Sequence, residues 1–373
     1  MTPEIKQRID KICHGEVPEG YQRTFLGIAP KSWDKSRIDK ICRLSSGSTP
    51  RRDAVENFAG DILWVTSGEL KRRTIEDTRE KISETAVVNS HLEIYDPGTV
   101  VIAIYGLEAA GIRGTVSIIG KQCTISQACM AFTEFKGIDN EFFYYWYLNN
   151  GQVIGLRYAQ GTKQQNLSTD IVGSFPICFP SQGEQQKIAA ILTTQDRVIE
   201  LKEKRLAEKQ RQKKYLMQQL LTGKKRLPGF SEEWKKVKIG SFIKEIDERS
   251  TVNNQYEILS VTKNGMVFQS SHFNKQIASE NNVGYKVVRR GNLAFSTMNL
   301  WMGSLDTLRI CDTGIVSPAY KVFEFNQSLI VVNFAENYMK SAEMIWLYKA
   351  NSEQGASIVR RNLDLQALLN SEV

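Results

Sequence analysis

The sequence lacks a long apolar run, because no stretch of its 373 residues approaches the ~20 apolar residues that a membrane-spanning helix needs. The stretch from Met1 to Asp10 is polar and charged, which excludes a secretion signal at that position. Cysteine is sparse, with six residues and no Cys-x-x-Cys pair. This pattern argues against a disulfide framework and favours free thiols in a reducing compartment. We therefore expect a soluble, cytoplasmic protein.

Catalytic motifs are equally scarce. The three histidines lie in no His/Cys cluster that could bind a metal ion. The segment from Gly114 to Gln122 has one residue too many for a phosphate-binding loop and ends without the hydroxyl that would bind Mg²⁺, so it is interpreted as a strand and turn. The sequence therefore predicts no catalytic residues, no metal site and no cofactor of its own. An enzyme with an acidic metal site among its scattered carboxylates stays an open alternative.

Positive charge is concentrated in one segment. Apolar residues make up 41% of the chain and charged residues 24%, which is typical of folded domains, and the length favours two of them. The net charge is +8, and the segment from Arg197 to Arg226 alone holds eleven Lys and Arg against three Glu. The rest of the chain is balanced, so any nucleic-acid contact outside this segment must use locally placed basic residues.

The same segment belongs to the clearest predicted helix. From Glu184 to Leu221 there is neither Pro nor Gly, and good helix formers dominate. Apolar residues lie at both ends of the helix and polar residues in its middle. A solvated helix between two lobes and half of an antiparallel helix pair both fit this pattern, and the second is favoured. The residues expected to pack in such a pair are Ile188, Ile191, Leu192, Val198, Leu216 and Leu220.

An internal repeat relates the two flanks of this helix. Short similarities recur in the same order at a nearly constant offset, which chance seldom produces. They pair Trp33 with Trp234, Thr133-Glu134-Phe135 with Phe323-Glu324-Phe325, Trp146 with Trp346, Asn166-Leu167 with Asn362-Leu363, and Ile12-Cys13-His14-Gly15 with Leu220-Leu221-Thr222-Gly223. Glu4 to Ile12 therefore corresponds to the last turns of the central helix.

The predicted fold class is α+β, with two tandem mixed, strand-rich domains joined by a long helix of coiled-coil type. The expected divisions are residues 1–183 with a short N-terminal helix at 4–12, residues 184–222 for the central helix, and residues 223–373. Residues 100–105 and 293–296 are predicted strands. The aromatic runs 142–148 and 344–348 are predicted core helices rather than base-stacking platforms.

Four stretches carry distinctive motifs: Ser46-Gly47-Ser48-Thr49-Pro50, the loop Gly161 to Leu167, Pro176 to Pro180 followed by Gly183 to Ala189, and Leu220 to Gly223 with Leu227 to Phe230. Together they resemble the DNA specificity subunit of type I restriction–modification enzymes. The resemblance implies two target recognition domains that each read one half of a bipartite DNA site, and helices that set the gap. It also implies a non-catalytic subunit that binds methyltransferase and restriction (motor-nuclease) subunits. S-adenosylmethionine, ATP and Mg²⁺ are then expected on those partners.

The second half departs from this pattern. Arg360-Arg361 stands where the first half has its Gly-Thr-Lys loop, and we expect that nothing in the second half corresponds to Pro176 to Pro180 or to the central helix. The second recognition domain is therefore expected to be incomplete at its C-terminal end and to lack the second spacer helix. Either a second copy or a separate chain supplies that helix, or the chain is an inactive, silent variant. A coiled-coil adaptor with two protein-binding lobes is the alternative function.

Base contacts are expected from polar and basic side chains on the loops of each domain, since Arg suits guanine edges and Asn or Gln suits adenine. The candidates are Arg51, Arg52, Lys71, Arg72, Arg73, Lys163, Gln164 and Gln165 in the first domain, and Lys263, Asn264, Asn299, Arg360 and Arg361 in the second.

Overall fold

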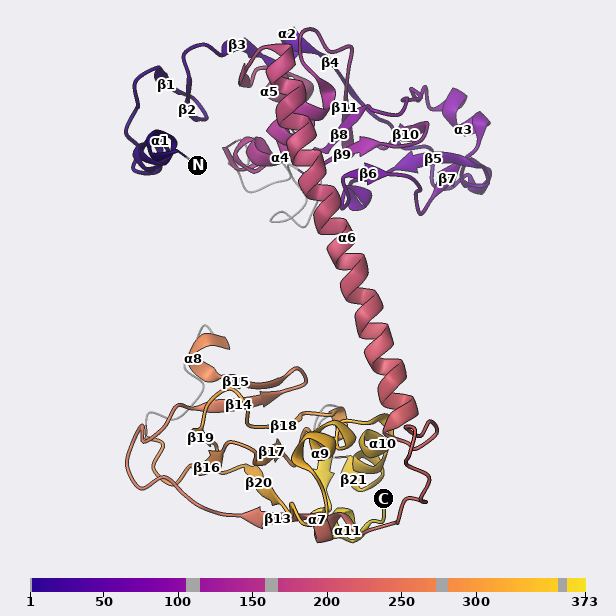
Figure 1. Cartoon of the computed structure of the whole chain (residues 1–373). Helices are drawn as coiled ribbons and strands as arrows, with labels where there is room; N and C mark the ends of the chain where they lie inside the picture. The colour runs from indigo at the N-terminus through magenta and orange to yellow at the C-terminus, as the bar shows by residue number, and fades with distance from the viewer. Residues whose placement is uncertain (1, 105–114, 158–166, 273–280, 355–360) are drawn as a thin grey trace. The chain divides into compact units, whose positions relative to one another are not determined.

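The chain forms two compact units, Met1–Lys202 and Glu203–Val373, in a computed structural model (Figure 1). The structure describes residues 2–104, 115–157, 167–272, 281–354 and 361–373. Within these residues, none of the helices combines the length and apolar character needed to cross a membrane.

The first unit contains α1 (Pro3–Cys13), α2 (Ile38–Ile41), α3 (Glu84–Asn89), α4 (Asn140–Arg157), α5 (Thr169–Gly173) and the start of α6 (Gln182–Leu220), with short 3₁₀ helices at Val55–Phe58 and Ser67–Glu69. Its strands are β1 (Tyr21–Thr24), β2 (Gly27–Pro30), β3 (Asp34–Arg37), β4 (Arg43–Ser46), β5 (Ile62–Val65), β6 (Thr74–Ile75), β7 (Lys81–Ile82), β8 (Val100–Ala103), β9 (Val116–Ile119), β10 (Cys123–Ile125), β11 (Cys129–Thr133) and β12 (Pro176–Phe179).

The second unit contains the end of α6 and the helices α7 (Ile239–Phe242), α8 (Gln269–His272), α9 (Val332–Tyr338), α10 (Ala342–Ala350) and α11 (Leu365–Asn370), with a 3₁₀ helix at Leu300–Met302. Its strands are β13 (Ile243–Ile246), β14 (Leu259–Thr262), β15 (Gly265–Phe268), β16 (Lys286–Arg289), β17 (Leu293–Ser296), β18 (Leu305–Thr307), β19 (Thr313–Val316), β20 (Tyr320–Phe325), β21 (Ser352–Gln354) and β22 (Arg361–Leu363).

The internal repeat is confirmed in the order of the strands. The main sheet of the first unit runs β4-β11-β8-β9-β6, and that of the second runs β13-β20-β17-β18. In both, the first four strands pair antiparallel with their neighbours. A short helix, α2 or α7, comes directly before the first strand of each sheet. The sequence repeat is therefore a repeat of one sheet architecture.

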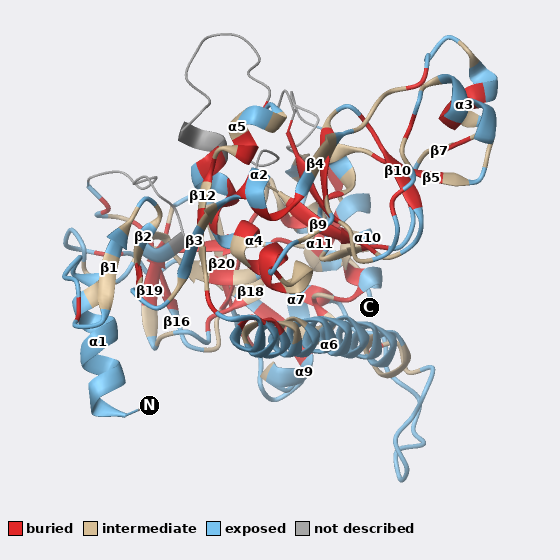
Figure 2. Ribbon diagram, turned by 90° about the horizontal axis from the view of Figure 1, so that it is seen from above, coloured by how far each residue is buried: buried red, intermediate tan, exposed pale blue. Residues whose placement is uncertain are grey.

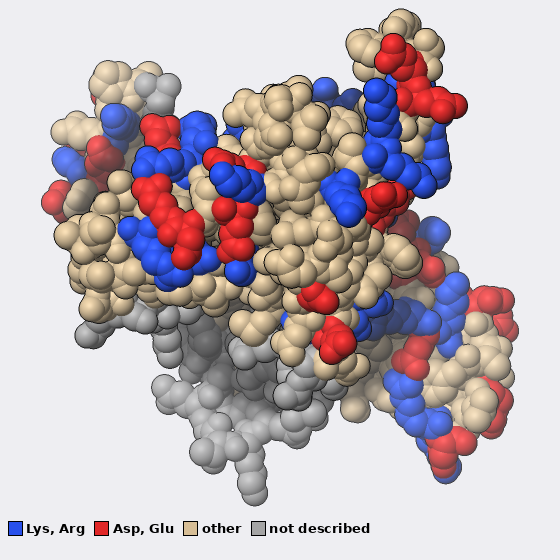
Figure 3. Space-filling model, turned by 90° about the horizontal axis from the view of Figure 1, so that it is seen from below, with Lys and Arg blue, Asp and Glu red and all other residues tan. Residues whose placement is uncertain are grey.

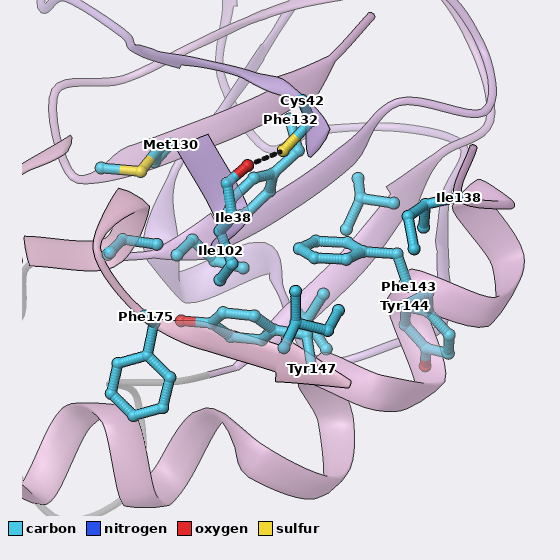
Figure 4. Packing of buried hydrophobic residues seen from close by; sticks show 14 of the residues in the cluster. Ile38, Cys42, Ile102, Met130, Phe132, Ile138, Phe143, Tyr144, Tyr147 and Phe175 are labelled. Atoms are coloured by element: carbon cyan, nitrogen blue, oxygen red, sulfur yellow. Dashed lines mark hydrogen bonds between the residues drawn. The ribbon is translucent and has the colours of Figure 1, made fainter. Parts of the chain in front are cut away.

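Aromatic side chains of α4 build the core of the first unit. Phe143 and Tyr147 are fully buried and contact Phe132 of β11, with ring centroids 4.9 Å apart for Phe132 and Phe143 (Figure 4). All four residues of β8 are buried, and Val100 and Ile102 belong to the same cluster as these rings. The prediction that the aromatic run 142–148 belongs to a core helix is confirmed, because rings packed in this way are unavailable to bases.

The second unit has a separate core, in which aromatic side chains again pack between a helix and the main sheet. Phe295 of β17 stacks on Phe323 of β20, with ring centroids 5.3 Å apart. Met344 and Tyr348 of α10 are buried against this sheet, and the Tyr348 hydroxyl donates to the Met339 carbonyl oxygen at 2.8 Å. The run 344–348 is therefore a core helix, as predicted, although Trp346 on its outer face is 69% exposed.

In each unit, the segment just before α2 or α7 pairs with a segment that follows the main sheet in the chain. In the first unit β3 pairs antiparallel with β12, and Arg37 lies opposite Pro176. In the second unit Lys238 bridges Glu372, while Val237 and Val373 exchange two N–H···O bonds of 3.0 Å. The expectation that nothing corresponds to Pro176 and Ile177 is therefore wrong. Backbone pairing defines this correspondence. The side chains at 176–177 and at 372–373 share too little similarity for the sequence alone to reveal it.

The helix α6 is 39 residues long, and at ~1.5 Å per residue it extends on the order of 58 Å. Of its residues, Gln185 and Ala189 are buried, and Figure 2 shows its remaining length as mainly exposed. Ile188 packs against the core of the first unit, whereas Ile191 is 64% exposed. The remaining predicted packing residues are at least partly exposed: Leu192, Val198, Leu216 and Leu220. The helix α1 also has no buried residue.

Candidate nucleic-acid interface

The segment Ser46 to Pro50 crosses the ends of two strands at close range. The Gly47 N–H donates to the Cys129 carbonyl oxygen and the Ser48 N–H to that of Ile125, both at 3.2 Å. A Cβ at Gly47 would lie 2.0 Å from the Ile125 carbonyl oxygen, which no side chain can tolerate. Glycine is therefore required here, and the chain then reaches the surface at Arg51 and Arg52.

Arg52 lies against two aromatic rings. Its guanidinium donates to both carboxylate oxygens of Glu80, at 2.6 and 3.0 Å, and lies over the rings of Phe58 and Trp64, 4.7 and 5.1 Å from their centroids. The hydrogen bond from Arg52 lowers the pKa of the Glu80 carboxyl group. The side chain of Arg51 is 82% exposed and pairs with Asp53 at 2.7 Å. Arg51 is therefore the freer of these two predicted contact residues.

A carboxylate organises the turn that follows β5. One oxygen of Glu69 accepts from the N–H and the hydroxyl of Thr66, at 2.7 and 3.2 Å. Its other oxygen accepts from the Arg79 N–H at 2.6 Å. This capping box fixes the turn at its start. After the buried Leu70, the side chains of Lys71 and Arg72 are exposed, and neither has an ion pair within the described part of the chain.

Arg73 closes the same turn with ion pairs to two helices. Its guanidinium binds Glu141 of α4, lies 3.9 Å from the carboxylate of Asp196 of α6, and sits 5.6 Å from the centroid of the Tyr144 ring. The Tyr145 hydroxyl donates to Asp196 at 2.6 Å. Arg73 therefore joins the turn to α4 and α6, and a role in base reading would require it to leave these partners.

The second unit carries a comparable turn between β14 and β15. The Thr262 hydroxyl donates to the Gly265 carbonyl oxygen at 2.9 Å, and the Asn264 N–H donates to the Thr262 hydroxyl at 3.1 Å. Asp306 of β18 accepts from the Met266 N–H at 2.7 Å and pairs with the ammonium group of Lys340. Lys263 and Asn264 are exposed at the tip of this turn.

The other predicted contact residues are less free or lie outside the described residues. Arg361 lies over the Trp301 ring, 5.0 Å from its centroid, and Asn299 is partly buried beside the 3₁₀ helix Leu300–Met302. Lys163, Gln164, Gln165 and Arg360 fall outside the described residues. On the face that Figure 3 presents, Lys and Arg lie beside Asp and Glu. Acidic side chains compete with DNA for neighbouring cations. The candidates for DNA contact are therefore the exposed cations that have no acidic partner among the described residues.

Sequence reasoning missed the carboxylates that hold these turns. The pattern Thr66-x-x-Glu69 is a readable capping signal, but Asp306 meets Met266 only through folding and leaves no local pattern. In the described part of the chain, no group of three or more His, Cys, Asp or Glu side chains is arranged to hold a metal ion.

Residues 30–210 match the family described as Type I restriction modification DNA specificity domain. Over 188 residues the chain is 30% identical to the type I restriction enzyme MjaIX specificity subunit of Methanocaldococcus jannaschii, which covers 49% of this chain and 42% of that protein. Over 175 residues it is 24% identical to the EcoR124I/EcoR124II specificity subunit of Escherichia coli, covering 46% and 43%. The matched region thus spans less than half the length of these curated relatives.

Two solved structures share the fold over most of their length. The crystal structure of a type I restriction–modification S subunit from M. genitalium gives a TM-score of 0.54 at 14% identity, covering 91% of this chain and 83% of that one. A structure titled for the assembly and conformational transition of the type I R-M system gives 0.52 at 15% identity, covering 92% and 86%. At these identities the likeness shows the architecture, namely an α+β chain with strand-rich units and a long helix.

Proposed function

Because residues 30–210 match the type I restriction modification DNA specificity domain, we propose that this chain is a specificity subunit that directs methylation and restriction to a bipartite DNA site. The observation that carries this proposal is the repeated sheet, β4-β11-β8-β9 in one unit and β13-β20-β17-β18 in the other. Two copies of one architecture with different surface loops suit two half-sites of different sequence.

In this proposal each unit reads one half-site with side chains on its loops, and the helices set the gap between the halves. Half-sites on one face of duplex DNA lie about one helical turn, ~34–36 Å, apart. Exposed cations such as Lys71 and Arg72 in the first unit and Lys263 in the second can bind either phosphates or base edges. Contacts of the first kind position the protein, and contacts of the second kind read sequence.

The proposed chemistry resides on partner subunits. In this proposal the chain recognises the DNA sequence, while the methyltransferase and restriction subunits carry out the chemistry that uses S-adenosylmethionine, ATP and Mg²⁺. We expect no heat of binding when S-adenosylmethionine is titrated into the chain alone. Saturable binding of the cofactor without partners would overturn this division of labour.

Salt dependence separates this function from that of a protein-binding adaptor. Counterion release should make the affinity for duplex DNA fall steeply between ~50 and 200 mM salt. The measurement is fluorescence anisotropy of a labelled duplex with the chain in complex with its methyltransferase subunits. An affinity that does not change with salt, or no binding at any salt concentration, would contradict DNA reading.

The modular reading of the site is tested by mapping methylation. The chain with its methyltransferase subunits and S-adenosylmethionine should place methyl groups on adenines of one discrete sequence. Replacing the first unit by that of a relative should change one half of this sequence and leave the other half unchanged. A change in both halves, or in neither, would show that the units do not read separately.

A further inference from the structure

Two turns occupy equivalent places in the two units. β5 lies parallel to β10, and the segment before β14 forms a parallel bridge to β19 through Ile258 and Ile315. The strands β10 and β19 directly precede β11 and β20, which are equivalent strands of the repeated sheet. The turns that follow β5 and β14 therefore leave the repeated architecture at corresponding points.

Both turns present two exposed polar side chains at their tips. These are Lys71 and Arg72 in the first unit, and Lys263 and Asn264 in the second. The three cations among them have no ion pair within the described residues, whereas arginines 51, 52 and 73 of the first unit all bind carboxylates. The four exposed side chains are therefore available to DNA. Lys and Arg can donate hydrogen bonds to guanine edges or to phosphate oxygens, and the Asn amide suits an adenine edge.

A carboxylate anchors each tip to the body of its unit. Glu69 ties the first turn to the Arg79 backbone, and Asp306 ties the second to β18 and Lys340. Both carboxylates accept backbone N–H donors, so they hold the backbone beneath the tip. A fixed backbone reduces the entropy that an Arg or Asn side chain loses when it binds a base edge.

We propose that the turns Thr66–Arg73 and Thr262–Met266 carry the specificity-determining side chains of their units, and that Glu69 and Asp306 are positioning residues for them. This inference rests on the proposed function and names the elements that perform it. Lys71 and Arg72 read one half-site, and Lys263 and Asn264 read the other. Arg73 joins the first turn to α4 and α6, so the reading element is rigid at both of its ends.

The test uses a pool of duplex DNA with randomised sequence, from which the complex of the chain with its methyltransferase subunits selects. Sequencing of the bound fraction should give two half-site motifs for the wild-type chain. The double variant Lys71→Ala/Arg72→Ala should reduce discrimination in one half about tenfold, which corresponds to the loss of a single good base contact. Lys263→Ala/Asn264→Ala should do the same to the other half only.

The positioning residues have their own readout. Glu69→Ala should relax the same half as Lys71→Ala/Arg72→Ala, and Asp306→Ala the half read by Lys263 and Asn264. Glu69→Gln, which keeps one acceptor oxygen, should restore part of the discrimination. A structural role alone would lower the amount of active complex without changing the preferred sequence.

The control removes the same charge elsewhere on the first unit. Lys40 and Lys136 are exposed near α2, and Lys40→Ala/Lys136→Ala should leave both motifs unchanged. If the wild-type complex enriches no sequence, the proposed function itself is wrong. If it enriches a bipartite sequence that both tip variants still select with full discrimination, the turns are not the readers, although the proposed function stands. Where an alanine at residue 69 or 306 prevents folding, the tip variants, which change exposed side chains only, decide.

Discussion

At the scale of single residues, close backbone contacts limit which side chains a position can accept. The path of Gly47 past the Ile125 carbonyl leaves no room for a methyl group. We expect Gly47→Ala to lower the free energy of unfolding by about 1–3 kcal/mol or more, because the strands must separate to admit the Cβ. Urea unfolding followed by tryptophan fluorescence measures the change. Gly183→Ala is the matched control, since its added Cβ meets nothing within 4 Å apart from the backbone of its own helical turn. An equal loss there would refute the steric account.

Buried thiols give the second prediction at this scale. Burial raises the pKa of Cys42, Cys123 and Cys129 from 9.0 to about 12. In the unfolded chain these thiols lose their protons near pH 9, whereas in the folded protein they keep them to about pH 12. Their contribution to stability is therefore fully present below pH 9 and falls above it, by up to ~1.4 kcal/mol per pH unit for each thiol.

Urea unfolding at pH 8, 9 and 10 should show this loss of stability. The variant Cys129→Ala should have a shallower dependence on pH than the wild-type chain, because one of the three titrating groups is absent. An identical slope for the two proteins would mean that the thiols do not carry the effect.

At the scale of elements, a buried amide fixes the start of α6. Gln185 accepts from the Asp139 N–H at 2.8 Å, and it donates to the carbonyl oxygens of Gly137 and Pro180, at 3.1 and 2.8 Å. Gln185→Ala leaves these groups without partners, and each buried unpaired group costs about 1–3 kcal/mol. We expect a clear drop in the free energy of unfolding for Gln185→Ala.

The neighbouring Gln186 provides the control, because it has the same side chain but is exposed on α6. Gln186→Ala should leave stability within ~0.5 kcal/mol of the wild-type value. Similar losses for both variants would show that helix propensity, rather than the buried hydrogen bonds, governs the start of α6.

Elements were predictable from the sequence where the pattern was local. The absence of Pro and Gly predicted a helix from residue 184 to about 221, and α6 runs from Gln182 to Leu220. The strand Leu293–Ser296 was also predicted with its observed bounds. Val373 pairs with Val237, and Asp306 accepts a hydrogen bond from the Met266 N–H. Both interactions join residues far apart in the chain, so no local sequence pattern predicted them. The DNA-contact residues stay predictions, although ion pairs distinguish Arg52 and Arg73 from the freer Lys71 and Arg72.

At the scale of the whole molecule, each unit has a hydrophobic core of its own. Phe143 belongs to the core of the first unit and Phe295 to that of the second. We expect two unfolding transitions in differential scanning calorimetry. Replacing a buried Phe by Ala costs about 3–5 kcal/mol, so Phe143→Ala should lower the midpoint of one transition and Phe295→Ala that of the other. If either variant shifted both transitions together, the units would unfold as one cooperative body.

The pairing of β3 with β12 also sets a condition on folding during synthesis. Residues 34–37 leave the ribosome long before their partners at 176–179. At ~5–20 residues per second the early strand waits on the order of ten seconds for its partner. During this time β3 is an open strand edge, but its sequence Asp34-Lys35-Ser36-Arg37 carries three charges in four residues. Charged edges resist pairing with other chains. The charged side chains of β3 therefore reduce the chance that this strand pairs with another chain before β12 has been synthesised.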